Sequence, residues 1–390
     1  MRKRMGTKIT ATAFATALLG AGLALPAAAG PRPAQDTLQD RVNAVQRTRT
    51  VGVQAQQTGP GGTEYATAGQ ADTSTGEPVR PGQAFRMAST TKTFVATAVL
   101  QLAGQGKLSL DDTVERWLPG VVSGNGHDGS KITVRQLLQH TSGVFNYTAD
   151  FPPLTDKEAF KANRFTTWTA EQLVAIAMRH QPAFPPGTSW GYSNTNYILA
   201  GMIIRKATGR TWQEQVTQGI IEPLGLARTT APSTFPYIPG PHMHGYSDFG
   251  VGGEVVDVTD WNPSGGEAAG AMTGTTADLT RFFRALMDGR LLRPAQLAEM
   301  KTTVRAEPLD VVWPGARYGL GLLQVPLTCG GSYYGHPGDL SGYTTRNAVS
   351  GDGGQAIVVE ATGDGTPDDL STQRALNSLI DKGFCPTDTK

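Results

Sequence analysis

The sequence of 390 residues lacks features that mark several classes of protein. Its 34 basic residues are nearly balanced by 33 acidic ones without any basic block, so nucleic acid is not an expected partner. After residue 29, no stretch is long and apolar enough to cross a bilayer. Internal repeats and low-complexity linkers are also lacking. We therefore expect the residues after 29 to form one large two-lobed unit or two domains.

Cysteine is scarce, since the chain has only Cys329 and Cys385. In an exported protein such a pair suggests a disulfide, and two buried free thiols are the alternative. A bond that closes so long a loop contributes roughly 4 kcal/mol in the chain-entropy model. It would tie the C-terminal helix to a strand near the end of the chain.

The first 29 residues differ in composition from the rest. A basic head at residues 2–8 precedes an apolar run at 9–25 and an alanine triplet at 27–29. This order is typical of a secretory signal peptide over residues 1–29. The run is short, it is broken by glycine and proline, and no cysteine follows it, so cleavage is favoured over a membrane or lipid anchor. We expect a secreted, extracellular monomer without a membrane anchor.

Strand patterns occur at both ends of the chain, and helix patterns lie between them. The expected strands are Thr50–Ala55, Thr63–Ala68, Tyr318–Val325, Ser332–His336, Tyr343–Ser350 and Gln355–Thr362. The expected helices are Leu38–Arg47, Ile132–His140, Thr169–His180, Asn196–Thr208, Thr211–Ile221, Thr276–Asp288 and Asp369–Lys382. The pattern predicts an α/β fold of the α+β type, with one antiparallel sheet built from both chain ends and flanking helices. The sheet lobe would span about 38–109 and 281–385, with a mostly helical lobe of about 110–280 inserted between them.

Ser89 and Lys92 stand three residues apart at the start of an apolar helical run, residues 94–102. Residues at this spacing share one face of a helix, so the hydroxyl and the amine can touch. An amine that lies against an apolar helix has a lowered pKa and can take the proton of a serine nucleophile. An ordinary helix start with a serine cap is the alternative interpretation.

Two other segments carry side chains suited to the same chemistry. In one loop, the phenol of Tyr192 can shuttle a proton, and the amide of Asn194 can hold a carbonyl. At the end of an expected strand, His336 can donate to a tyrosine oxygen or carry a proton, and Gly338 lets a substrate backbone approach closely. Ordinary turns are the alternative interpretation of both segments.

Taken in this order, the three motifs resemble the serine β-lactamase and penicillin-binding protein superfamily, in its class C-like branch. The resemblance extends to residues 135–143, 192–197 and 318–321, and is strongest to the soluble exocellular D-alanyl-D-alanine carboxypeptidases. It implies a β-lactamase-like serine hydrolase domain over residues 30–390 and a disulfide between Cys329 and Cys385.

The resemblance also implies roles for individual residues. Ser89 would be the acylated nucleophile, Lys92 would assist its deprotonation, and Tyr192 would be the general base or a proton shuttle. Asn194 would bind the substrate amide, and His336 would stand where many relatives have a lysine. The backbone N–H groups of Ser89 and Asp339 would form an oxyanion hole. No metal and no cofactor are expected.

The implied function is that of an exported carboxypeptidase that cleaves D-alanyl-D-alanine peptides through an acyl-enzyme. The expected partners are small peptide or ester substrates, including peptidoglycan stem peptides and β-lactams. The alternatives are an esterase, a D-amino acid amidase or aminopeptidase of the same fold, a β-lactamase, and a non-catalytic penicillin-binding module.

The chain departs from the carboxypeptidases where those enzymes hold the free carboxylate of the substrate. They use two hydroxyl residues and an arginine, whereas this chain has Pro337, Asp339 and Leu323. The carboxylate of Asp339 would repel that of the substrate, and Arg346 is the nearby cation that would compensate. A tryptophan expected near the pocket is also shifted, with Gly265 in its place and Trp261 earlier in the chain.

Three further patterns have plainer interpretations. Ser189 lies in a Gly-x-Ser-x-Gly match, but the proline-rich segment before it is not a central strand, so we interpret the match as chance. His242 and His244 have no third ligand nearby in the sequence and are interpreted as a loop pair. We expect His140 to be a structural hydrogen-bonding residue.

Overall fold

The computed structural model describes residues 36–152, 156–250, 254–364 and 370–385. The predicted signal peptide at residues 1–29 lies outside these residues, as does Asp369 at the start of a predicted helix. None of the helices in the described ranges is long and apolar enough to cross a membrane.

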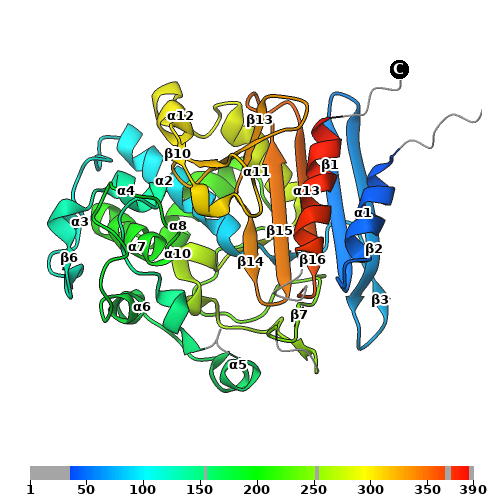
Figure 1. Ribbon diagram of the computed structural model, residues 1–390, viewed down its shortest axis with the longest axis horizontal. Coiled ribbons are helices and arrows are strands. Elements are labelled where there is room, and N and C mark those ends of the chain that lie inside the picture. The colour runs from blue at the N-terminus through cyan, green and yellow to red at the C-terminus, as the bar shows by residue number, and fades with distance from the viewer. Residues whose placement is uncertain (1–35, 153–155, 251–253, 365–369, 386–390) are drawn as a thin grey trace, which may run out of the picture. The chain divides into compact units, whose positions relative to one another are not determined.

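Strands from both ends of the chain form one antiparallel sheet, as predicted (Figure 1). From one edge to the other it runs β10 (Val304–Arg305), β11 (Arg317–Tyr318), β12 (Leu323–Pro326), β13 (Ser332–Gly335), β15 (Tyr343–Val349), β16 (Ala356–Thr362), β1 (Gly52–Gly59), β2 (Gly62–Asp72) and β3 (Glu77–Pro78). A short strand that the sequence analysis did not predict, β14 (Gly338–Leu340), also pairs with β15. The first long strand, β1, therefore lies beside the last, β16.

Both faces of the sheet are covered by helices, and strand β16 shows how the sequence arranges this. Its alternate residues Ile357, Val359 and Ala361 belong to one core cluster, with the apolar residues of α1 (Leu38–Gln46) and α13 (Ser371–Phe384). Ala356 and Val358 point to the other face and belong to the larger cluster, with α11 (Thr276–Met287). Because successive side chains of a strand point to opposite faces, every residue of β16 is buried.

Helix α2 (Thr91–Gly104), which follows Ser89, is the buried centre of the helical part. Its residues are apolar or small on nearly all sides, which is typical of a helix enclosed by other helices. It contacts α7 (Thr195–Thr208), α8 (Trp212–Val216), α10 (Glu267–Gly270) and α12 (Pro294–Lys301). The ring of Phe94 stacks on that of Phe282 in α11, with 3.6 Å between ring centroids.

Threonine caps lie within one residue of the predicted starts of two helices. Thr169 caps α6 (Ala170–Ala177) and Thr133 caps α4 (Val134–Gln139), each in a reciprocal bond with a glutamine three residues later. These bonds satisfy backbone N–H groups that have no partner within the helix. Helix α4 ends at His140, whose left-handed backbone (φ 61°) stops the helix there.

The prediction of one continuous strand over Tyr318–Val325 is wrong. The segment folds into the hairpin β11–β12, in which Tyr318 pairs with Leu323. Gly321 at the turn has φ +70°, a conformation that favours glycine. At Gly319, a side chain would stand 2.1 Å from the carbonyl oxygen of Met300, so only glycine allows the close approach of these backbones.

The predicted disulfide is confirmed. Cys329 follows β12 and Cys385 ends α13, and their sulfur atoms are bonded with the Cα atoms 5.6 Å apart. The bond joins the C-terminal helix to the sheet across a sequence separation of 56 residues.

Removal of this bond should lower stability without changing the fold. In the chain-entropy model, the double variant Cys329→Ser/Cys385→Ser loses up to roughly 4 kcal/mol of unfolding free energy. Denaturant unfolding of both proteins measures the difference. The unfolded, unreduced wild type should show no free thiol in a titration, and two reactive thiols would contradict the bond.

Candidate active site

Ser89 lies in the 3₁₀ turn η1 (Ala88–Thr90), which leads directly into α2. Ala88 has φ 46°, a strained left-handed backbone for a residue with a side chain. Ser89 itself is partly exposed and lines two cavities. Strain of this kind persists only where the surrounding packing enforces it, and here it presents a hydroxyl at the start of the buried helix.

Lys92 is fully buried, and its amine contacts three oxygen atoms. Its Nζ lies 3.0 Å from Ser89 Oγ, 2.7 Å from Asn194 Oδ1 and 2.7 Å from the carbonyl oxygen of Ala269. The structure therefore brings together Ser89, Lys92 and Asn194 from two distant segments of the chain. The predicted helical spacing accounts for the first contact.

The environment of Lys92 favours the neutral amine. Burial lowers the pKa of Lys92 well below its ordinary value. A neutral amine has two N–H groups and one lone pair, while the oxygens of Asn194 and Ala269 can only accept hydrogen bonds. Both N–H groups are then used, and the lone pair faces Ser89 Oγ. This arrangement suits Lys92 to take the serine proton.

The ring of Tyr192 lies next to the same amine. Lys92 Nζ is 4.9 Å from the centroid of its ring. Burial raises the pKa of Tyr192, while its hydrogen bond with Ser89 acts in the opposite direction. The phenol is therefore neutral at ordinary pH, and it can relay a proton more readily than it can hold a negative charge.

The ring of His140 packs against that of Tyr192, with 4.3 Å between ring centroids. Its Nδ1 accepts from the backbone N–H of Ser193 and from the amide of Asn196, so the ring proton is on Nε2. Burial lowers the pKa of His140 well below its usual range. These bonds fit the predicted structural role.

His336 is buried at the end of β13 as a neutral ring. Its Nδ1 lies 2.7 Å from the carbonyl oxygen of Pro337, which can only accept, so Nδ1 carries the proton. Its Nε2 then accepts from the hydroxyl of Tyr318 at 2.7 Å, the reverse of the predicted donation to a tyrosine. Burial lowers the pKa of His336 to about 3, so near neutral pH it does not carry a second proton.

Asp339 is exposed beside Ser89 and is held by a buried cation. Its Oδ1 lies 3.0 Å from a guanidinium nitrogen of Arg346, whose side chain is only 3% exposed. Arg346 also donates to the carbonyl oxygen of Thr345 and to Gln373, and lies over the ring of Trp313. Arg346, the cation expected to compensate for the repulsion of a substrate carboxylate, is thus already the partner of Asp339.

Asn347 on β15 connects the turn that bears Ser89 to the His336 segment, and no sequence motif marks this role. Its side chain donates to Thr90 Oγ1 and to the carbonyl oxygen of His336, and accepts from the His336 backbone N–H. Nearby, a side chain at Gly338 would stand 2.1 Å from the carbonyl oxygen of Met87. The absence of a side chain at Gly338 therefore lets β14, with the backbone of Asp339, lie against the turn that bears Ser89.

Two cavities meet at Ser89, Asn194 and Asp339. The larger, of about 410 Å³, has a mostly apolar wall formed by Leu309, Trp313, Tyr318, Leu323 and Pro337. The smaller, of about 170 Å³, is lined by aromatic rings from Tyr147, Phe151 and Trp261. Among the described residues that line either cavity, Asp339 is the only aspartate, glutamate, lysine or arginine.

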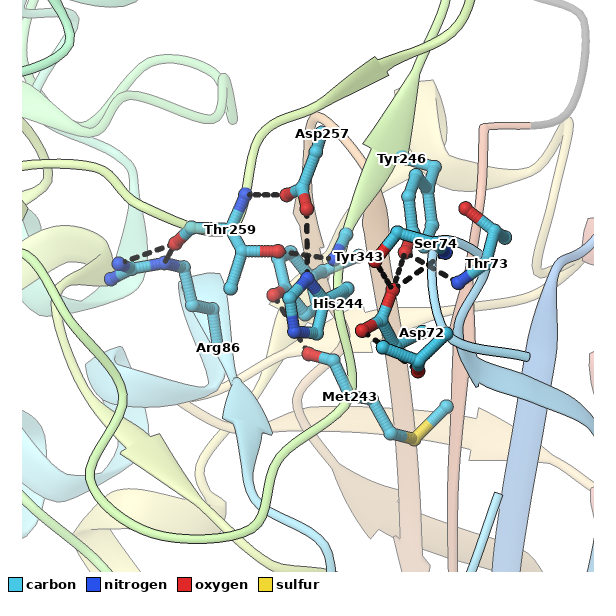
Figure 2. Close-up of polar contacts among 12 residues, drawn as sticks. Asp72, Thr73, Ser74, Arg86, Met243, His244, Tyr246, Asp257, Thr259 and Tyr343 are labelled. Carbon is cyan, nitrogen blue, oxygen red and sulfur yellow. Dashed lines mark hydrogen bonds and ion pairs between the residues drawn. The ribbon is translucent and has the colours of Figure 1, made fainter. Parts of the chain in front are cut away.

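Trp261 reaches the smaller cavity although it comes earlier in the chain than the position expected for a tryptophan. A side chain at Gly265 would stand 3.0 Å from the Trp261 ring and 2.8 Å from Phe151, so glycine leaves room for both rings. Figure 2 shows how the segment before Trp261 is held: the guanidinium of Arg86 donates to the carbonyl oxygen of Thr259. The buried Arg86 also donates to the carbonyl oxygen of Trp261.

His242 and His244 lie in a loop, in agreement with their interpretation as a loop pair. His244 Nδ1 lies 2.7 Å from Asp257 Oδ2, and the Tyr343 hydroxyl donates to the carbonyl oxygen of Met243 (Figure 2). Among the described residues, no three histidine, cysteine or acidic side chains are grouped to hold a metal ion. Ser189 is exposed in a turn and is not part of either cavity lining.

Comparisons with known proteins match most of the chain. The family model described as Beta-lactamase matches residues 34–381. A D-stereospecific amidohydrolase from Streptomyces sp. is 41% identical, with a TM-score of 0.82 over 91% of this chain and 100% of that one. The D-amino acid amidase of Ochrobactrum anthropi, complexed with L-phenylalanine amide, is 30% identical, with a TM-score of 0.76 over 89% and 96%.

Curated relatives include penicillin-binding proteins. Penicillin-binding protein 4* of Bacillus subtilis is 27% identical over 71% of this chain, a match that spans 60% of its own length. Penicillin-binding protein 4 of Amycolatopsis lactamdurans is 28% identical over 73% of this chain and 74% of its own length.

Replacement of Ser89 tests its predicted role as the nucleophile. Ser89→Ala should abolish acylation by a reactive ester such as p-nitrophenyl acetate, because only the attacking hydroxyl is removed, while the melting temperature stays close to that of the wild type. Mass spectrometry of the intact protein detects the acyl group. Ser189→Ala is the matched control and should acylate normally; the opposite result would assign the nucleophile to Ser189.

Proposed function

Because the chain belongs to the Beta-lactamase family, we propose that it is a D-stereospecific serine hydrolase of amino-acid amides and esters, acting through an acyl-enzyme on Ser89. The two amide-hydrolysing structural neighbours support the substrate class. The disulfide supports export, which we propose together with the basic and apolar N-terminal segment. The observation that carries the proposal is the Asp339 carboxylate, fixed by Arg346 beside the nucleophile.

Asp339 makes a free substrate carboxylate unfavourable at this place. The buried guanidinium of Arg346 contacts Asp339 Oδ1, so the negative charge at the cavity mouth is part of the folded site. Neither Leu323 nor Pro337 offers a hydrogen-bond donor from its side chain. An amino group of the substrate, in contrast, can pair with the exposed carboxylate.

The reaction follows from the contacts of Ser89. Its Oγ attacks the substrate carbonyl carbon while its proton passes to Lys92 Nζ, 3.0 Å away. The carbon–nitrogen or carbon–oxygen bond to the leaving group breaks as Tyr192 relays a proton to that group. Water then cleaves the serine ester, which releases the amino acid and returns a proton to Ser89. Backbone N–H groups of Ser89 and Asp339 are suited to hold the oxyanion.

The two cavities suggest how the substrate lies. The cavity with Leu323 and Pro337 adjoins His336 and suits the leaving group, for which its apolar wall and volume of about 410 Å³ favour a bulky uncharged alcohol or amine. The cavity with Trp261 then takes the side chain of the acyl residue, and its aromatic lining favours an apolar one.

Carboxypeptidase action on D-alanyl-D-alanine peptides is the competing proposal. It draws on the penicillin-binding relatives and shares the same acylation chemistry. The two proposals differ only in what the leaving group presents to Asp339, so matched substrates separate them.

The ratio of kcat/KM for matched substrates tests the proposal. D-alanine amide and a D-alanyl ester should be hydrolysed at least about tenfold more efficiently than the matching D-alanyl-D-alanine peptide, since an unpaired buried carboxylate costs several kcal/mol. Asp339→Thr with Leu323→Arg should narrow or reverse this preference. The two single variants complete a double-mutant cycle, which is needed because neighbouring substitutions are not additive. A wild type that prefers the free-carboxylate peptide would restore the carboxypeptidase assignment.

The aromatic wall should set side-chain preference. Trp261→Ala should reduce the preference for D-phenylalanine amide over D-alanine amide by about tenfold, because the larger side chain loses more apolar contact. Tyr237→Ala removes an exposed aromatic ring that does not line either cavity, and serves as the matched control. An unchanged preference in Trp261→Ala would place the acyl side chain elsewhere.

A further inference from the structure

Glu267, the first residue of α10, combines two unfavourable features at one position. Its backbone has φ 44°, in the left-handed region that residues with side chains rarely adopt. Its largely buried carboxylate accepts a hydrogen bond from the indole N–H of Trp212 and another from the backbone of Ala268. Trp212 and Ala268 both lie close to Gly201 of α7. A side chain at Gly201 would stand 2.9 Å from Ala268, so this packing depends on glycine. Strain and a buried charge at one residue call for a functional explanation.

The turn that Glu267 begins touches the catalytic residues through its backbone. Two residues later, the carbonyl oxygen of Ala269 accepts from Lys92 Nζ at 2.7 Å. The next residue, Gly270, lies against the backbone of Ala88, immediately before the nucleophile. The carbonyl oxygen of Met272 then accepts a hydrogen bond from the backbone N–H of Met87 at 3.0 Å. The position of this turn therefore determines where the Lys92 amine points.

We propose that Glu267 is a positioning residue, which through its bond to Trp212 holds the turn whose Ala269 carbonyl directs the Lys92 amine at Ser89. The inference rests on the acylation chemistry of the proposed function and not on its substrate. Glu267 touches neither Ser89 nor substrate-lining atoms of the larger cavity. It acts through the backbone of α10.

The charge of Glu267 changes close to neutral pH. Burial raises the pKa of Glu267 from 4.5 to about 7, and the bonds from Trp212 and Ala268 oppose this. Of the groups that face it, exposed Glu171 on α6 raises the pKa further and exposed Arg205 on α7 lowers it. The neutral phenol of Tyr147 also faces it.

Protonation of Glu267 weakens the bond that holds the turn. An ionised carboxylate forms the stronger, charge-assisted hydrogen bond with the indole, and a protonated carboxyl forms an ordinary one. As the pH falls through about 7, the turn loosens and the acylation rate falls. The rate of acylation by p-nitrophenyl acetate, a neutral ester, therefore has an acid limb that belongs to Glu267.

The contribution of Glu267 to the free energy of unfolding should change with pH in the opposite direction to the acylation rate. The unfolded chain loses the Glu267 proton near 4.5 and the folded chain near 7, so the raised pKa contributes stability below 4.5 that is lost as the pH rises through 7. Glu267→Gln retains the shape and removes the ionisation. It should melt above the wild type at about pH 8 and close to it at about pH 4.

The experiment measures acylation rate against pH for the wild type and Glu267→Gln. We expect the variant to lose the limb near 7 and to acylate at least about tenfold more slowly at about pH 8, although it is then the more stable protein. Glu267→Gly, which suits the left-handed backbone, should also acylate slowly while it remains folded. A purely structural role would instead make loss of rate follow loss of melting temperature.

Two charge variants outside the site give the matched control. Glu171→Gln should move the acid limb to lower pH, and Arg205→Gln should move it to higher pH, with the rate above the limb unchanged in both. An acid limb of the acylation rate that remains in Glu267→Gln would overturn the proposal, and so would a limb that does not move in either charge variant. In both cases the limb would belong to another group. Failure of the substrate preference proposed above leaves these ester measurements unaffected.

Discussion

The site depends on one buried amine that is bonded to three segments of the chain. Lys92 Nζ lies within hydrogen-bond distance of Ser89 in the turn before its own helix, of Asn194 before α7, and of the Ala269 carbonyl on α10. Burial in an apolar helix lowers the pKa of this amine, and the two fixed acceptors use its N–H groups. The same packing that makes α2 the centre of the core therefore favours the neutral amine that the proposed base requires.

The electrostatics of the two sides of Ser89 differ. On one side, neutral groups surround the nucleophile, because burial keeps Tyr192, His140 and His336 uncharged. On the other, Asp339 carries a negative charge that Arg346 holds in place. The groups proposed to move protons are thus neutral, while the charged carboxylate of Asp339 lines both cavities.

Local physics explains which features the sequence predicts. The threonine caps of α4 and α6 and the contact of Ser89 with Lys92 depend on residues three apart, so the spacing alone places them. The carbonyl of Ala269 has no sequence signal, because every residue has a carbonyl. The contact between Asp339 and Arg346 depends on the pairing of β14 with β15, and the tautomer of His336 depends on tertiary neighbours. The sequence does not mark the hairpin at Gly321, because its apolar residues continue the strand pattern.

The protonation state of Lys92 tests the account most directly. Nuclear magnetic resonance of protein labelled at lysine Cε and Nζ, with Lys92 assigned through Lys92→Arg, follows its titration against the ordinary lysine value of about 10.4. The account predicts that the Lys92 amine loses its proton at a clearly lower pH than the exposed lysines do. A Lys92 resonance that titrates together with those of the exposed lysines would contradict it, and the serine proton would then have to go to another group.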